Sequence, residues 1–171
     1  MRHLRLVSAA VGFVLLALVP QSVGAAAPLR FPGSVFSGSF VPGTDNEVCP
    51  FQVDTGPVDV KVVVTVYFDS HGTPIKLSFT GLIVVFLTNH GTGKTLIVNA
   101  SGPGFEYLQP DGSALAFGGG PGLIGLTPRD EGGPRLLLIM GHETFNVARD
   151  GRISNLQTVG VVTDMCAVLA G

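Results

Sequence analysis

Apolar and polar side chains alternate along the chain from residue 57 onward. The first such segment places apolar residues at every second position and polar ones such as Asp59 and Lys61 between them. The apolar set is Val58, Val60, Val62, Val64, Val66 and Phe68. A period of two is typical of a strand with one face in a core and the other in water. The pattern predicts a long β-strand that ends at residue 68.

Shorter apolar runs fill the rest of the chain, and clusters of Gly, Pro, Asn and Asp separate them. Strands at short spacing joined by turn residues are typical of an antiparallel meander. The further predicted strands cover residues 75–80, 82–88, 95–100, 105–109, 114–117, 123–126, 135–140, 143–148 and 153–163. No segment after the first 25 residues has a helical period, so the predicted fold class is all-β, with about 8–10 strands.

Two of these runs, residues 82–87 and 136–140, are apolar at both parities. A strand of this kind needs cover on both faces. The segment 26–48, rich in Pro, Gly and Ser and here called the N-terminal arm, could supply that cover through Phe31, Phe36 and Phe40. A second subunit is the alternative, so a homo-oligomer stays open.

The first 25 residues have the pattern of a signal peptide. Arg2 and Arg5 precede an apolar run over residues 6–19, and small residues follow at 23–25. Pro20 interrupts the run before it reaches the roughly 20 residues that span a bilayer. We therefore expect secretion of a soluble product with three parts: signal peptide (1–25), N-terminal arm (26–48) and β-domain (49–171).

Cys49 and Cys166 are the two cysteines of the chain. An even count in an oxidising compartment predicts one disulfide. In the chain-entropy model, closing so long a loop is worth about 4–5 kcal/mol. The bond would bring the two ends of the meander within about 6 Å between α-carbons. Adjacent first and last strands predict a closed β-barrel, and a sandwich is the alternative.

The charge balance argues against a nucleic-acid partner. The chain has 10 Lys and Arg against 12 Asp and Glu, and Arg2 and Arg5 leave with the signal peptide, so 8 basic residues face 12 acidic ones. Binding to nucleic acid needs a basic surface. We expect no nucleic-acid partner, and no membrane association after signal cleavage.

The triplet Asp54-Thr55-Gly56, which follows an apolar residue, resembles the active-site loop of aspartic peptidases. Those enzymes share one proton between two carboxylates, so a chain with one triplet would have to dimerise about Asp54. Pro57 follows where those families usually carry Ala or Ser, and the same triplet is common in turns before a strand. A turn is the favoured interpretation, and a dimeric acid peptidase is the alternative.

Other candidate chemistry rests on single residues. Gly93-Lys94-Thr95 lacks the earlier glycine of a phosphate-binding loop, and His142-Glu143 lacks the second His of a zincin. No metal and no cofactor are expected. Glu106 or Glu143 could act as a lone acid in a cofactor-free barrel enzyme, and Tyr67 and Tyr107 could line a ligand cavity.

Several short motifs occur in an order that resembles a group of small secreted proteins common in actinobacteria. They are Cys49-Pro50-Phe51, Thr88-Asn89, Thr92-Gly93-Lys94-Thr95, Asn99-Ala100-Ser101-Gly102-Pro103, Asp111-Gly112-Ser113 and Asp164-Met165-Cys166-Ala167. The resemblance covers about residues 49–169. It implies secretion, one disulfide and an all-β fold, and it implies no activity, because none is established for that group.

These observations favour a binding protein over an enzyme. We expect a secreted, disulfide-closed β-barrel that acts as a ligand-binding or cell-envelope-associated module. The expected partner is a small apolar ligand or a surface polymer.

Overall fold

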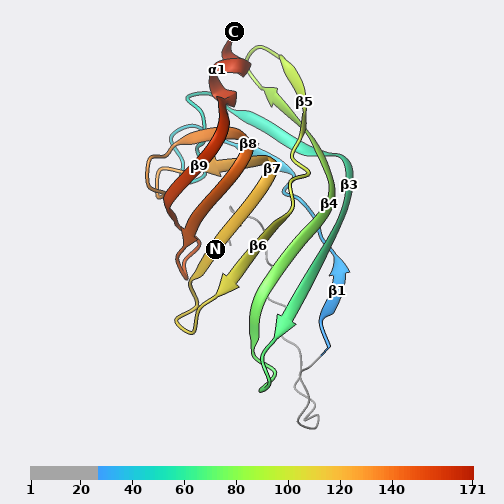
Figure 1. Cartoon of the computed structure of the whole chain (residues 1–171). Helices are drawn as coiled ribbons and strands as arrows, with labels where there is room; N and C mark the ends of the chain where they lie inside the picture. The colour runs from blue at the N-terminus through green and yellow to red at the C-terminus, as the bar shows by residue number, and fades with distance from the viewer. Residues whose placement is uncertain (1–26) are drawn as a thin grey trace, which may run out of the picture.

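Long antiparallel strands form one twisted sheet in the part of the chain that the structure describes, residues 27–171 of a computed structural model (Figure 1). The predicted signal peptide lies outside the described residues. The elements are β1 (Leu29–Pro32), β2 (Gly38–Phe40), β3 (Val53–Phe68), β4 (Pro74–Asn89), β5 (Thr95–Asn99), β6 (Gly104–Leu108), β7 (Ala114–Leu126), β8 (Arg135–Val147), β9 (Ile153–Asp164) and α1 (Met165–Ala170). The all-β prediction is confirmed.

The order of hydrogen-bonded strands is β1-β3-β4-β6-β7-β8-β9, which is largely the predicted meander. Two short strands pair with half of a long one: β2 with the first residues of β3, and β5 with the last residues of β4. β6 pairs with the opposite half of β4. The sheet is therefore split at the end where β5 lies, because the second half of β7 extends beyond β6.

The prediction of a closed barrel is wrong. In the described chain β9 pairs with β8 and with no strand at the other end of the sheet, so an open, curved sheet or sandwich fits better. The predicted disulfide is confirmed, with its α-carbons 5.4 Å apart. It joins the segment before β3 to helix α1, which follows β9. The ends of the meander thus meet through side chains, and nearness of the ends did not require a closed hydrogen-bond ladder.

Helix α1 was not expected from the sequence. The Asp164 carboxylate caps it by accepting hydrogen bonds from the backbone N–H groups of Cys166 and Ala167. Six residues are too few to produce a recognisable helical period. The buried Met165 and Leu169 anchor α1 to the core.

Glycines that were predicted to end strands lie inside them instead. Gly81 lies within β4 and Gly141 within β8, with φ of +129° and +157°. Gly120, Gly141 and Gly160 are cross-strand neighbours on β7, β8 and β9, and all three have positive φ. We call these three residues the glycine row. Glycine adopts such conformations readily, so the strands can continue through them.

The sheet curls strongly on itself across β7–β9. The Glu131 N–H, in the loop before β8, donates a hydrogen bond to the carbonyl of Ile153 at the start of β9. Ile153 pairs with Val147 at the far end of β8, so about 40 Å would separate the two ends in a flat ladder. The hydrogen bond therefore requires that the strands bend between these ends, and the glycine row lies in that interval.

Two apolar clusters fill the two sides of this curled sheet. One contains Leu87, Leu136 and Leu169 around the disulfide, and the other contains Leu137 and Ile139 inside the curl. Adjacent residues of β8 thus enter different clusters, as expected of a run that is apolar at both parities.

The N-terminal arm supplies part of the cover that was predicted for it. Phe40 packs against the cluster around the disulfide, whereas Phe31 and Phe36 are exposed. The arm also contributes β1 and β2 to the sheet, so it is more than a linker.

Candidate functional site

The structure brings Tyr67 and Tyr107 together around Lys76. Both pair with Lys76 in the ladder of β3, β4 and β6, and the Lys76 Nζ lies 5.6 Å and 5.2 Å from their ring centroids. The same ammonium is 4.6 Å from the Phe105 ring, which stacks on Phe117 at 5.0 Å. These are the distances of cation–π and stacked aromatic pairs. On the outer face of the sheet the rings therefore contact one another and the Lys76 ammonium.

Asp54 is the centre of a hydrogen-bonded cluster that joins β2, β3 and the turn after β4. Its Oδ1 accepts from Ser39 Oγ at 2.5 Å and from Gln52 Nε2 at 2.9 Å, and its Oδ2 lies 2.8 Å from His90 Nδ1. Hydrogen bonds from Ser39, Gln52 and His90 lower the Asp54 pKa to about 2.

This arrangement does not resemble an acid–base relay. In a Ser-His-Asp triad the imidazole lies between the hydroxyl and the carboxylate, whereas here Ser39 and His90 both contact Asp54. The carboxylate is held ionised, while an aspartic peptidase pair must hold a shared proton. The acid peptidase remains a prediction that the geometry of this cluster does not favour.

Glu143 is a buried carboxyl on the inner face of β8. Glu143 is only 7% exposed, and within the described residues its Oε2 has no hydrogen-bond partner. Burial raises the Glu143 pKa, and the positive charge of nearby His142 opposes this shift. A Cβ at Gly118 or Gly122 would lie 2.0 Å or 2.6 Å from Oε1, so the glycines of β7 make room for this carboxyl.

Glu106 lies on the same face of the sheet, on the other side of β7. It is the cross-strand neighbour of Ala116, and Glu143 is that of Gly118, two residues further along β7. Burial also raises the Glu106 pKa. Loss of solvent is thus the main cause of the raised pKa of both carboxyls, and both positions favour the protonated form.

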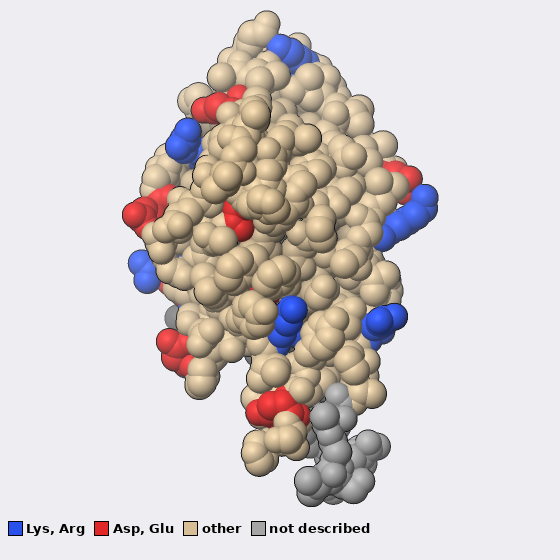
Figure 2. Space-filling model, viewed as in Figure 1, with Lys and Arg blue, Asp and Glu red and all other residues tan. Residues whose placement is uncertain are grey.

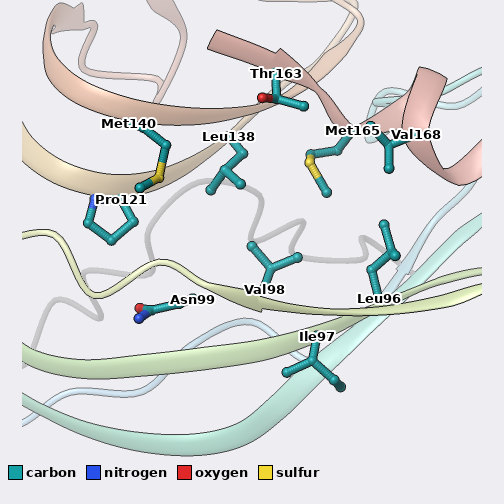
Figure 3. A pocket seen from close by; sticks show the side chains of 10 residues that line it. All are labelled: Leu96, Ile97, Val98, Asn99, Pro121, Leu138, Met140, Thr163, Met165 and Val168. Carbon is teal, nitrogen blue, oxygen red and sulfur yellow. The ribbon is translucent and has the colours of Figure 1, made fainter. Parts of the chain in front are cut away.

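A groove opens where the sheet is split between β5 and β8 (Figure 3). Its volume is about 420 Å³. Figure 3 shows Leu96 and Val98 of β5 directed toward Leu138 and the α1 side, while Ile97 is directed away. The lining residues are Leu96, Ile97, Val98, Asn99, Pro121, Leu138, Met140, Thr163, Met165 and Val168. Asn99 and Thr163 are the polar members of this set.

Sequence reasoning did not identify the groove. Its residues come from four strands and one helix. Within its own segment, each of them has the sequence pattern of an ordinary core or surface residue. The one available signal was the pair of strands apolar at both parities, because Leu138 and Met140 belong to the second of them.

The surroundings of the groove carry little charge. Figure 2 shows that the face formed by β6–β9 is mostly uncharged, with Lys, Arg, Asp and Glu mainly around its outline. In the described part of the chain no helix is long and apolar enough to cross a membrane. Within residues 27–171, no group of three or more His, Cys, Asp or Glu side chains could hold a metal ion.

Comparisons with known proteins add no identity. No family model matches the chain, and neither curated proteins nor solved structures show a significant similarity to it. The functional argument therefore depends on the geometry of the molecule itself.

Proposed function

We propose that the protein is a secreted binding module that holds a small apolar molecule in the groove between β5 and β8. The observation that carries this proposal is the groove itself, an apolar hollow of about 420 Å³. Ligand sites commonly have volumes of about 300–1,000 Å³ and mostly apolar walls with a few polar groups. Asn99 and Thr163 could each accept or donate a hydrogen bond, which suits a ligand with one or two polar atoms.

The walls of the groove are held in place before any ligand arrives. Met165 and Val168 lie on α1, and Cys166, which follows Met165 on this helix, is bonded to Cys49. Lys94 Nζ also donates a hydrogen bond to the Val168 carbonyl. A preformed site loses less conformational entropy on binding, so the disulfide supports affinity as well as stability. A structural disulfide also fits an oxidising, extracellular compartment.

The chemistry of the lining supports binding more than catalysis at the groove. None of the ten lining residues ionises near neutral pH. General acid–base and nucleophilic catalysis both depend on such groups. The two carboxyls with raised pKa, Glu106 and Glu143, are not among the residues that line the groove.

The test is a titration with the uncharged, apolar fluorescent probe 1-anilinonaphthalene, followed by native mass spectrometry of the purified protein. We expect saturable binding at one site, weakened at least tenfold by Met140→Lys. Met140 is 50% exposed, so a charge there should enter the mouth of the groove without disturbing the core.

Ile75→Lys is the matched control, because Ile75 is an exposed apolar residue of β4 outside the groove. It should leave probe binding unchanged. Non-saturable binding, or an equal loss in the two variants, would reject the groove as the binding site.

A further inference from the structure

Strand β9 has an open edge. It ends the sheet, and among the described residues β8 is the one strand that pairs with it. The loop before β8 covers the start of this edge through hydrogen bonds at Ile153 and Asn155, so the open part begins at Leu156. It is 12 residues long, and Asp164 at its last position is its only charged side chain. Natural proteins usually protect a sheet edge with charged side chains, proline or short strands. β1 and β2 at the opposite end have 4 and 3 residues and so are short, whereas the open part of β9, from Leu156 to Thr163, has no charged residue and no proline.

Exposed apolar side chains follow this edge. Val159 is 72% exposed and Val161 65% exposed. Met140, the cross-strand neighbour of Val161 on β8, is 50% exposed. Single exposed apolar residues are ordinary on protein surfaces, but a row of them beside unpaired backbone groups marks an interaction surface.

The glycine row restricts which strand could extend the sheet here. Gly120, Gly141 and Gly160 have positive φ and lie side by side, so three neighbouring strands bend at the same cross-strand position. A Cβ at Gly141 would lie 2.0 Å from the Val159 carbonyl oxygen, and one at Gly160 would lie 2.3 Å from that of Met140. A fourth strand that follows the same bend needs a glycine at this cross-strand position. The β9 strand of a second copy has one at the matching position.

We propose that two copies of this chain pair antiparallel through β9, about a twofold axis at Gly160. In this register the residue numbers of two opposed positions sum to 320. Val159 therefore lies opposite the partner's Val161, and the twofold axis repeats this pair, so the dimer contains it twice. Thr158 lies opposite the partner's Val162 in the same way. The pairing is self-complementary because β9 has no charge before Asp164, and Asp164 falls opposite the partner's Leu156. The sheet becomes continuous across both copies.

Sedimentation equilibrium of the full chain over a concentration series, read beside far-ultraviolet circular dichroism, tests the dimer. The expected result for the wild-type protein is twice the mass of one chain. Val159→Lys and Val161→Glu should each weaken dimerisation at least tenfold, because each places a charge opposite a valine of the partner. Both positions are exposed, so the variants should keep the native fold. Ile75→Lys, on β4, should dimerise like the wild type.

The double variant Val159→Lys/Val161→Glu tests the register. In the proposed pairing each new lysine lies opposite a new glutamate of the partner, so dimerisation should return. A wild-type monomer at about 100 μM, or a trimer or larger ring, overturns the proposal. So does a folded double variant that stays as weak as the single variants. The groove proposal is tested by probe binding and does not depend on this result.

Discussion

At the scale of single residues, Glu143 is the group whose surroundings suit its charge least. Because burial raises its pKa in the folded state, folding favours the protonated form. Below the unfolded pKa of about 4.5 the carboxyl is protonated in both states, and its charge does not affect the free energy of unfolding. As the pH rises toward the folded pKa, the unfolded state ionises first, and the stability of the folded state falls. Glu143→Gln should raise stability at pH 7.5 by on the order of 1 kcal/mol, or about 3–4 °C in Tm.

Thermal melts of the two proteins at pH 4 and pH 7.5 measure this effect. The gap between them should be smaller at pH 4, where the wild-type carboxyl is protonated. A gap that is equal at the two pH values would show that the substitution acts through packing over Gly118 and Gly122 instead of charge.

Asp54 has the opposite sign. Its folded pKa of about 2 lies below the ordinary aspartate value of 3.8, so its contribution to stability is present above pH 3.8 and is lost as the pH falls toward 2. Asp54→Asn should lower stability at pH 7 by about 0.5–1.5 kcal/mol, because the cluster is partly exposed. Urea unfolding at pH 7 and pH 3 measures the difference, which should shrink at the lower pH.

The same variant decides the peptidase alternative. If a purified preparation cleaves protein substrates at pH 4, Asp54→Asn should abolish that cleavage in a dimeric acid peptidase. Unchanged cleavage would remove this alternative.

At the scale of elements, alternation and turn chemistry predicted where strands lie but not where they stop. β4 was predicted as two strands broken at Gly81, and β8 as two strands broken near Gly141. Turns and bends of a strand both use glycine with positive φ, so the residue type alone does not separate them. Whether such a glycine ends a strand or bends it depends on the strand that pairs there. The local sequence does not show which strands pair.

Substitution of Gly81 tests this account of β4. A Cβ at Gly81 would lie 2.0 Å from the carbonyl oxygen of Lys61 on β3, and the residue has a φ of +129°. Backbone cannot move aside cheaply, so Gly81→Ala should cost more than about 2 kcal/mol in urea unfolding. Gly72→Ala is the control, because Gly72 has a φ of +80° with no atom within 4 Å of its Cβ position, and should cost about 1 kcal/mol. Equal costs would show that strain at φ, and not the approach of β3, explains Gly81.

The candidate site was less predictable than the strands. Tyr67 and Tyr107 are neighbours, and the residues that contact them, Lys76 and Phe105, were not predicted from the sequence. The groove exists because β5 pairs with only half of β4, which is a property of strand length and register. Neither property is encoded in a local motif, so no motif search could have found the groove.

At the scale of the whole molecule, the disulfide replaces the hydrogen bonds that would close a barrel. Cys49 is almost completely buried in the cluster that includes Leu87, Leu136 and Leu169, so the bond links the start of the β-domain to its last element through the core. Its loop spans 117 residues, and such a loop restricts the unfolded chain by about 4–5 kcal/mol.

Removal of this bond should therefore affect stability and binding together. The double variant Cys49→Ser/Cys166→Ser avoids a single unpaired thiol, and it should lose about 3–5 kcal/mol in urea unfolding. Where it is still folded, it should bind the anilinonaphthalene probe several-fold more weakly, because α1 no longer fixes Met165 and Val168 at the groove wall. Probe titration at low temperature separates the two effects. Unchanged affinity in the folded variant would mean that the packing of Met165 and Leu169 and the Lys94 hydrogen bond hold the helix, and that the disulfide serves only to restrict the unfolded chain.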